Sequence, residues 1–284
     1  MSRPSGLAEL EELARAFHRG EKTPAEPRHA STVVLLRDSD QGPEAYLLRR
    51  VKGMAFAGGM HVFPGGSVDR ADAEASIAWA GPPAERWAQW FRADVPLARA
   101  LVCAAVRETF EECGVLLAGP SADELLADVS SDEWEAERAA LEAREQSLSE
   151  LLARRGLVLR ADLLRPFAHW ITPEVEPKRF DTRFFLAEMP AGQVCRHVGS
   201  EADERLWVPV RGALDQGLTL MPPTHSALQD LAPFDDVRSA LDAEREVTLV
   251  APKLVVMPDD SVKFVVPGDR DYPENAFTSY PERD

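Results

Sequence analysis

The chain has 284 residues and is 45% hydrophobic, so it can bury a core as one large domain or two small ones. Its formal net charge of −16 argues against nucleic acid as a partner, because the phosphates would be repelled at long range. The same repulsion would act on a free nucleotide, so binding one requires a local basic patch together with metal ions.

Several classes of protein are disfavoured by simple features of the sequence. Three widely spaced cysteines favour a reducing compartment over a disulfide framework. No apolar run approaches the ~20 residues of a membrane span, and the N-terminus lacks a basic-then-apolar signal pattern. The last three residues are not a peroxisomal address. We therefore expect a cytoplasmic protein without a membrane partner.

The first part of the chain predicts a peripheral helix followed by a hairpin. Apolar residues spaced as on a short amphipathic helix occur before residue 18, and residues 20–29 resemble a linker. Residues 31–36 are apolar and β-branched, which predicts a buried strand. A turn then leads to a second strand at residues 44–50.

Basic residues gather where the second strand ends. Arg49, Arg50 and Lys52 shortly precede a glycine doublet in the segment Phe63-Pro64-Gly65-Gly66. They are either a solvated strand end or a contact to substrate phosphates, with Arg50 and Lys52 as the candidates. His61 lies among apolar residues, where a structural role is the more frequent one.

The stretch of residues 69–96 carries several aromatic residues. Trp87, Trp90 and Phe91 have helical spacing, which predicts packing against the core. A wall that stacks on an adenine ring is the alternative. The sequence alone assigns no role to the acids at the start of this stretch, Asp72 among them.

Three carboxylates define the next predicted helix. Glu108, Glu111 and Glu112 are spaced i, i+3 and i+4 and therefore share one face of a helix. The opposite side carries Val102, Val106, Phe110 and Cys113. Gly114 is typical of a helix end. Like charges on one face are unfavourable, so the face is either simply solvated or holds a hard divalent cation such as Mg²⁺ or Mn²⁺.

The glycine doublet favours the cation. Two adjacent glycines let the backbone approach a metal or a phosphate closely. Gly65 and Gly66, together with the carboxylate helix, can therefore form one site, although they lie about forty residues upstream.

The remainder of the chain predicts an alternation of helices and strands. Ser121 and Glu124 have the spacing of a capping box, and residues 121–155 predict two helices, either a lid or an oligomer contact. A homodimer is therefore one possibility that the sequence leaves undecided. Beyond these helices we expect strands at residues 159–172 and 180–187, a strand ending near 210, helices at 211–216 and 224–231, and three strands within 247–266.

A charged loop of this second half offers a further candidate. Arg179 belongs to a basic cluster that is either a solvated loop or a phosphate contact.

The domain organisation that we expect is an N-terminal segment at 1–30, one domain at 31–268 with insertions at about 69–96 and 121–155, and a polar tail at 269–284.

The pattern resembles the Nudix hydrolases, whose box reads G-x5-E-x7-R-E-U-x-E-E-x-G-U with U a bulky apolar residue. The second half matches Arg107-Glu108-Thr109-Phe110-Glu111-Glu112-Cys113-Gly114-Val115, with the bulky residue shifted by one position, and Gly66 is the opening glycine. Gly66 and Arg107 are 41 positions apart (107 − 66) where the box has 14, so about 27 residues are inserted. The residue eight positions before Arg107 is Arg99 and not the glutamate that usually pairs with the box arginine.

The interrupted box resembles the subgroup related to the peroxisomal coenzyme A diphosphatases. Arg50, the segment from Gly59 to Gly66, and the stretches at 170–173 and 179–186 are similar to that subgroup. Two signature positions differ, being Leu48 and Ala55 here.

The resemblance implies an α/β/α sandwich with a mixed sheet and a Mg²⁺- or Mn²⁺-dependent diphosphatase for a small nucleotide substrate. It implies metal ligands at Glu108, Glu111, Glu112 and the Gly65 carbonyl. Arg107 would orient Glu111, and the general base would be Glu111, Glu112, Glu201 or Glu204. Coenzyme A or an acyl-coenzyme A is the expected substrate. ADP-ribose, dinucleotides, capped RNA ends and a non-catalytic nucleotide sensor are the alternatives.

Overall fold

The computed structural model describes residues 6–54, 57–73, 77–196 and 202–273. The chain folds as two compact units. The smaller unit contains residues 1–28, 170–181 and 249–284, and the larger contains residues 29–169 and 182–248. The boundaries expected at 30 and 268 stay predictions.

The smaller unit holds the N-terminal helix and a hairpin. Helix α1 (Gly6–His18) packs on strand β12 (Lys253–Val256), which pairs antiparallel with β13 (Val262–Val265). The Arg15 guanidinium donates to the Asp260 carbonyl in the hairpin turn at 3.0 Å. Strand β11 (Leu249–Val250) also belongs to this unit. The expected N-terminal helix and C-terminal hairpin are therefore both present.

The larger unit is built around one sheet. Its strands run in the order β10-β2-β1-β9-β8, and β3 and β4 pair with β2 and β1. Their bounds are β1 (Arg28–Ser39), β2 (Gly42–Arg50), β3 (His61–Val62), β4 (Gly65–Ser67), β8 (Leu164–Ile171), β9 (Phe180–Glu188) and β10 (Ala202–Pro209). Strands β1 and β2 form the expected hairpin, because Ser39 pairs with Gly42 across a two-residue turn.

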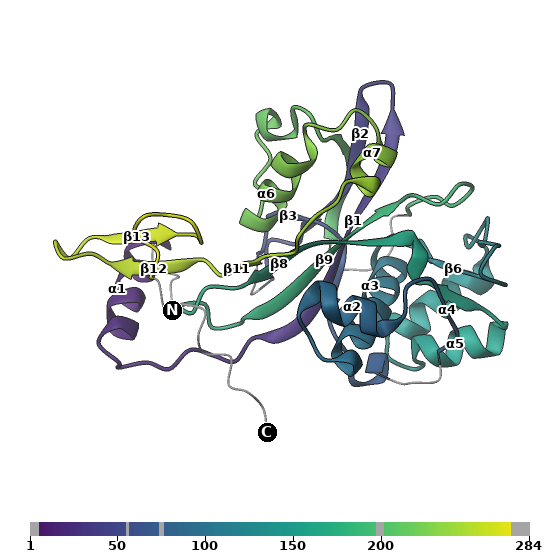
Figure 1. Cartoon of the computed structure of the whole chain (residues 1–284), viewed down its shortest axis with the longest axis horizontal. Helices are drawn as coiled ribbons and strands as arrows, with labels where there is room; N and C mark the ends of the chain where they lie inside the picture. Colours follow the sequence, from purple (N-terminus) through teal and green to yellow (C-terminus); the bar gives the residue numbers. More distant parts are fainter. Residues whose placement is uncertain (1–5, 55–56, 74–76, 197–201, 274–284) are drawn as a thin grey trace. The chain divides into compact units, whose positions relative to one another are not determined.

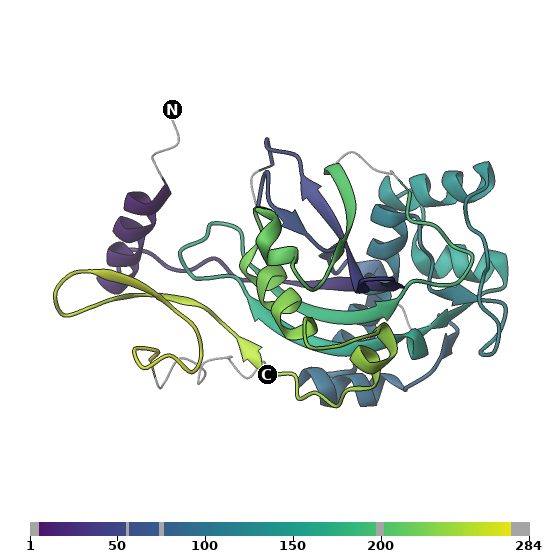
Figure 2. The same cartoon turned by 90° about the horizontal axis from the view of Figure 1, so that it is seen from above.

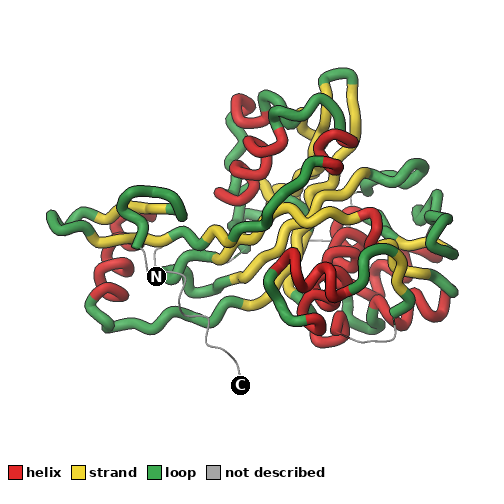
Figure 3. The backbone as a smooth tube through the Cα atoms, viewed as in Figure 1, coloured by secondary structure: helices red, strands yellow, loops and turns green. Residues whose placement is uncertain are grey.

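Helices cover the sheet from two sides, as Figures 1 and 2 show. On one side lie α2 (Ala84–Phe91), α3 (Val95–Cys113), α4 (Asp132–Glu142) and α5 (Leu148–Arg155). On the other side lie α6 (Pro222–Leu231) and α7 (Val237–Asp242). Strands between two groups of helices are also evident in Figure 3. The expected α/β class, a mixed sheet between helices with helical insertions, is confirmed. No described helix has the length and apolar character needed to cross a membrane.

The first inserted stretch packs its aromatic residues into the core, as predicted. Trp87 is fully buried and Phe91 is nearly so. The ring centroids of Trp87 and Phe185 are 5.5 Å apart, and those of Phe91 and Phe185 are 5.0 Å apart. Because Trp87 is buried, neither face of its ring is accessible for stacking on an adenine.

A small sheet joins three separate parts of the larger unit. Strand β7 (Val158–Arg160) pairs in parallel with β5 (Trp79–Ala80) and antiparallel with β6 (Ala118–Gly119). The described residues also form the short 3-10 turns η1 (Arg70–Ala73), η2 (Ala161–Leu163) and η3 (Ala213–Gln216). The last of these replaces the helix that the sequence predicts at 211–216.

The capping box predicted at Ser121 does not begin a helix. Its hydroxyl accepts from the Asp123 and Glu124 N–H groups at 3.2 Å, which is a local turn. The chain then runs back beside β6, where the Leu126 N–H donates to the Ala118 carbonyl. The two expected helices begin later, after the N-cap residues Ser131 and Ser147, and only Ser147 forms a capping box.

Candidate functional site

Helix α3 carries the acids that the sequence singles out. It begins at the N-cap Asp94, whose carboxylate accepts from the Leu97 N–H at 2.7 Å. It ends at Gly114, which has φ 69° and ψ 22°, a left-handed conformation that suits glycine. The apolar residues Val102, Val106, Phe110 and Cys113 are fully buried, as predicted. The sequence therefore fixes both the end of this helix and its buried side.

The glycine doublet and the acids converge, as the sequence predicts. The Gly65 N–H donates to Glu112 Oε2 at 2.7 Å. A Cβ placed on Gly66 would lie 2.5 Å from Glu108 Oε1, so only glycine admits the carboxylate at this position. Both glycines are held in β4, where they pair with Thr32 and Ser31 of β1. A strand therefore presents the doublet to the helix.

Arg107 lies at the centre of the cluster and is 7% exposed. Its Nη1 donates to Glu108 Oε1 at 2.8 Å and to both carboxylate oxygens of Glu111 at 3.2 Å. Its Nη2 donates to the Ser67 carbonyl at 2.9 Å. The expected pairing of Arg107 with Glu111 is therefore present, and Arg107 also ties the helix to the end of β4.

Asp72 is the residue that the sequence analysis missed. Its two carboxylate oxygens accept from Nε and Nη2 of Arg107, each at 3.0 Å. Counted from Gly66, Asp72 is six positions on (72 − 66), where the box G-x5-E has its acid. Counting back from Arg107 instead leads to Arg99. The interruption therefore falls between Asp72 and Arg107, and the arginine keeps a carboxylate partner.

Burial shapes the electrostatics of the cluster. Burial raises the pKa of Glu108 to about 7, against the attraction of Arg107. Burial likewise raises the pKa of Glu111 and that of Asp72. Burial opposes the charge of Arg107, but the carboxylates of Glu108, Asp72 and Glu111 raise its pKa above the ordinary value. The cluster thus holds more acids than its one buried arginine can balance.

The chemistry of the donor set fits a hard divalent cation. Carboxylate and carbonyl oxygens are the ligands that Mg²⁺ and Mn²⁺ prefer, and the bare Cα of Gly66 lets Glu108 lie against the backbone. Within the described ranges, no three His, Cys, Asp or Glu side chains are grouped closely enough to hold a metal ion. In this arrangement Glu108 and Glu111 accept from Arg107, and Glu112 accepts from Gly65.

The predicted basic residues fall in different places. Arg50 ends β2 and is half-buried, and Lys52 is exposed in the following turn. Arg179 lies in the smaller unit, where its guanidinium donates to the carbonyls of Thr172 at 3.0 Å and Ala25 at 2.8 Å. These bonds support a structural role for Arg179. The phosphate contacts of Arg50 and Lys52 stay predictions.

Of the two candidate bases Glu201 and Glu204, only Glu204 is described, and it lies in β10. Its Oε2 lies 2.6 Å from Arg49 Nη1 and 3.8 Å from His61 Nε2. His61 is buried, and its Nδ1 lies 3.2 Å from the Thr219 carbonyl. Glu201 lies outside the described residues. The structure thus connects Glu204 to the basic end of β2, and its role as a base stays a prediction.

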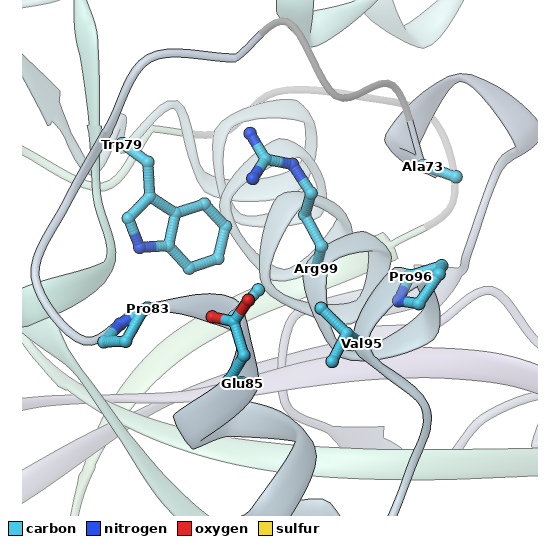
Figure 4. Close-up of a pocket in the computed structure, with 8 residues that line it drawn as sticks. Ala73, Trp79, Pro83, Glu85, Val95, Pro96 and Arg99 are labelled. Carbon is cyan, nitrogen blue, oxygen red and sulfur yellow. The ribbon is translucent and has the colours of Figure 1, made fainter.

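A separate hollow of about 390 Å³ opens beside the first inserted stretch (Figure 4). The guanidinium of Arg99 lies 5.2 Å from the centre of the Trp79 ring and donates to the Ile77 carbonyl at 2.8 Å. The remaining walls are Ala73, Pro83, Ala84, Glu85, Val95 and Pro96. Arg99 precedes Arg107 by eight residues, about 12 Å along the helix. The hollow therefore does not coincide with the acid cluster.

The chain is similar to a known protein family and to named members of it. Residues 27–215 match the family model described as the NUDT19 Nudix domain. The chain is 28% identical over 292 residues to the acyl-coenzyme A diphosphatase NUDT19 of Gallus gallus, covering 82% of this chain and 73% of that protein. It is 24% identical over 278 residues to the Xenopus laevis protein of the same name, covering 82% and 72%.

A solved structure shares the architecture. The Nudix hydrolase from Alicyclobacillus acidocaldarius superposes with a TM-score of 0.64 and 31% sequence identity. The match covers 79% of this chain and 99% of that one. The similarity thus extends over the whole of that protein, and the resemblance seen in the sequence is confirmed.

Proposed function

The chain belongs to the NUDT19 Nudix domain family of Nudix hydrolases, and from this premise we propose that it hydrolyses the diphosphate bond of coenzyme A or an acyl-coenzyme A. The observation that carries the proposal is the contact of the glycine doublet with the acids of α3, through the 2.7 Å bond from Gly65 to Glu112. The names of the two curated relatives support the coenzyme A part.

The cation of the proposed reaction is Mg²⁺ or Mn²⁺, held by Glu108, Glu111, Glu112 and the Gly65 carbonyl. When bound, such an ion neutralises phosphate oxygens and lowers the pKa of a coordinated water. Arg107 keeps Glu108 and Glu111 in place through its bonds to both. Asp72 keeps Arg107 in place in turn. Positioning and electrostatic stabilisation should provide most of the acceleration.

A base must take the proton of the attacking water. Glu111 and Glu112 are candidates within the acid cluster, Glu204 of β10 is a third, and Glu201, which lies outside the described residues, is a fourth. Glu204 Oε2 lies 2.6 Å from Arg49 Nη1, and this ion pair holds its carboxylate beside the end of β2. The cytoplasmic location, a homodimer and the exclusion of nucleic acid stay predictions.

A screen of diphosphate substrates tests the proposal. We expect the full chain with Mg²⁺ or Mn²⁺ to cleave coenzyme A and an acyl-coenzyme A faster than ADP-ribose, NADH or diadenosine polyphosphates. The products are identified by chromatography, and a reaction with EDTA is the control. Faster cleavage of any of the other compounds would contradict the assignment of coenzyme A as the substrate. No cleavage of any compound would contradict the assignment of diphosphatase activity.

Arg50 provides a test of substrate recognition. We expect Arg50→Ala to raise KM about tenfold for coenzyme A and less for ADP-ribose, because one charge-assisted bond to phosphate contributes roughly 1.5–3 kcal/mol. Steady-state kinetics on both substrates provides the measurement. Arg37→Ala is the matched control, since Arg37 pairs with Glu44 and stacks on Trp207. Equal effects on the two substrates would argue against a coenzyme A contact.

A further inference from the structure

The C-terminal end of α3 is supported by residues from outside the helix. The last carbonyls of an α-helix have no partner within it. Here the Glu111 carbonyl accepts from Arg138 Nη1 at 2.9 Å, and the Cys113 carbonyl accepts from the Arg196 N–H at 2.8 Å. Arg138 belongs to α4 in the second inserted stretch, and Arg196 follows β9. Two distant segments thus meet at the turn that carries Glu111 and Glu112.

One carboxylate joins the two arginines. Glu135 Oε1 accepts from Nη2 and Nε of Arg138 at 2.7 and 2.9 Å, and Glu135 Oε2 accepts from Arg196 Nη1 at 2.8 Å. Arg138 is only 5% exposed and also donates to Glu142 at 2.7 Å. A guanidinium with several fixed acceptors has a single orientation. The arrangement therefore fixes Arg138 against the helix end.

Packing supports the same connection. The rings of Phe110 in α3 and Trp134 in α4 meet edge to face with centroids 6.3 Å apart. A Cβ placed on Gly114 would lie 2.7 Å from Arg196 Nε, so Arg196 also lies directly against the end of α3. A positive charge at a helix C-terminus is favourable. The second inserted stretch thus contacts the last turn of α3 through both apolar and charged groups.

We propose that Arg138, joined to Arg196 by Glu135, is a positioning residue that orients the last turn of α3 for divalent-cation binding. The inference rests on the proposed function in one respect, namely that Glu111 and Glu112 are metal ligands. Arg138 touches the backbone of Glu111 and not its carboxylate, so it acts through the helix. Partners that orient metal ligands typically contribute a factor of 10–100 in metal affinity or activity.

Calorimetric titration of the full chain with Mn²⁺ tests this role without requiring turnover. We expect Arg138→Met to weaken Mn²⁺ binding about tenfold or more. Arg155→Met is the matched control, because Arg155 stacks on Trp134 and pairs with Glu133 and Glu137 in the same inserted stretch. The control should bind Mn²⁺ like the wild type. In turnover assays, Arg138→Met should lower kcat more than it changes KM, and Arg138→Lys should recover part of the loss.

Two results would overturn the positioning role: wild-type Mn²⁺ affinity in Arg138→Met, or equal losses in Arg138→Met and Arg155→Met. If Arg138→Met does not fold, Glu135→Gln replaces it, since this change keeps Arg138 and weakens its link to Arg196. A folded Glu135→Gln protein with unchanged Mn²⁺ affinity would overturn the role equally. A wild-type protein that binds Mn²⁺ but cleaves no diphosphate would instead overturn the proposed function alone.

Discussion

We expect Glu112→Gln to abolish metal-dependent diphosphate hydrolysis and to leave the fold intact, and we expect the same of Glu111→Gln. Glutamine keeps the size of the side chain, and its carbonyl oxygen can still accept from the Gly65 N–H that now binds Glu112. It removes the negative charge that a hard cation requires. We expect turnover to fall on the order of a thousandfold, as for the loss of a group that stabilises a transition state electrostatically.

The measurement is the initial rate as a function of Mg²⁺ and Mn²⁺ concentration, with circular dichroism and the thermal midpoint as checks of the fold. Glu145→Gln is the control, because Glu145 is exposed just beyond α4 and lies outside the acid cluster. It should keep the wild-type rate. Normal turnover by either Glu111→Gln or Glu112→Gln with Mg²⁺ present would refute the assignment of the acids.

Replacing Asp72 by asparagine should cost about 3 kcal/mol or more of unfolding free energy, because it removes one partner of a buried ion pair. Asp72 is 3% exposed and Arg107 is 7% exposed. Asparagine would turn one N–H group toward the guanidinium in place of an acceptor oxygen. Urea unfolding provides the free energy, and Mg²⁺ titration of turnover should show that the variant also needs more metal.

Asp69→Asn is the matched control for this change. Asp69 lies three residues earlier, its side chain is 36% exposed, and its carboxylate is 3.4 Å from Arg144. An exposed pair of this kind contributes at most about 1 kcal/mol. If the two variants lost equal stability, Asp72 would not be the anchor of Arg107.

The end of α3 and the contact of its acids with the glycine doublet were predictable, and the reasons are local. Gly114 marks a left-handed helix end in the sequence as in the structure, and the spacing of Glu108, Glu111 and Glu112 requires one helix face. The contact of Gly65 with Glu112 joins distant segments. The family pattern, and not local propensity, predicted it.

The sequence does not identify Asp72, because the interruption of the box can be placed at either of two points. Counting back from Arg107 requires that the spacing next to the arginine is kept, whereas the structure shows that the spacing after Gly66 is the one preserved. The start of the helices in residues 121–155 was misplaced for another reason. The Ser121 hydroxyl accepts from the Asp123 and Glu124 N–H groups in a turn, and the Leu126 N–H donates to the Ala118 carbonyl in place of a helical partner.

The support provided by Arg138 had no sequence signal. An arginine on a helix rich in Glu and Arg predicts exposed pairs within that helix, and Arg138 does pair with Glu135 and Glu142. Its bond to the Glu111 carbonyl spans 27 positions and depends on how α4 packs against α3. Such a contact follows from tertiary packing alone.

The small sheet of β5, β6 and β7 has a consequence for the order in which the protein is assembled. Trp79 pairs with Leu159, 80 positions later (159 − 79), and Ala118 pairs with the same residue. Closing loops of this length costs entropy before their contacts contribute, which slows folding. During synthesis, β5 therefore cannot pair until β7 has left the ribosome. The acid-bearing helix α3 reaches its final surroundings only after more than half of the chain has been made.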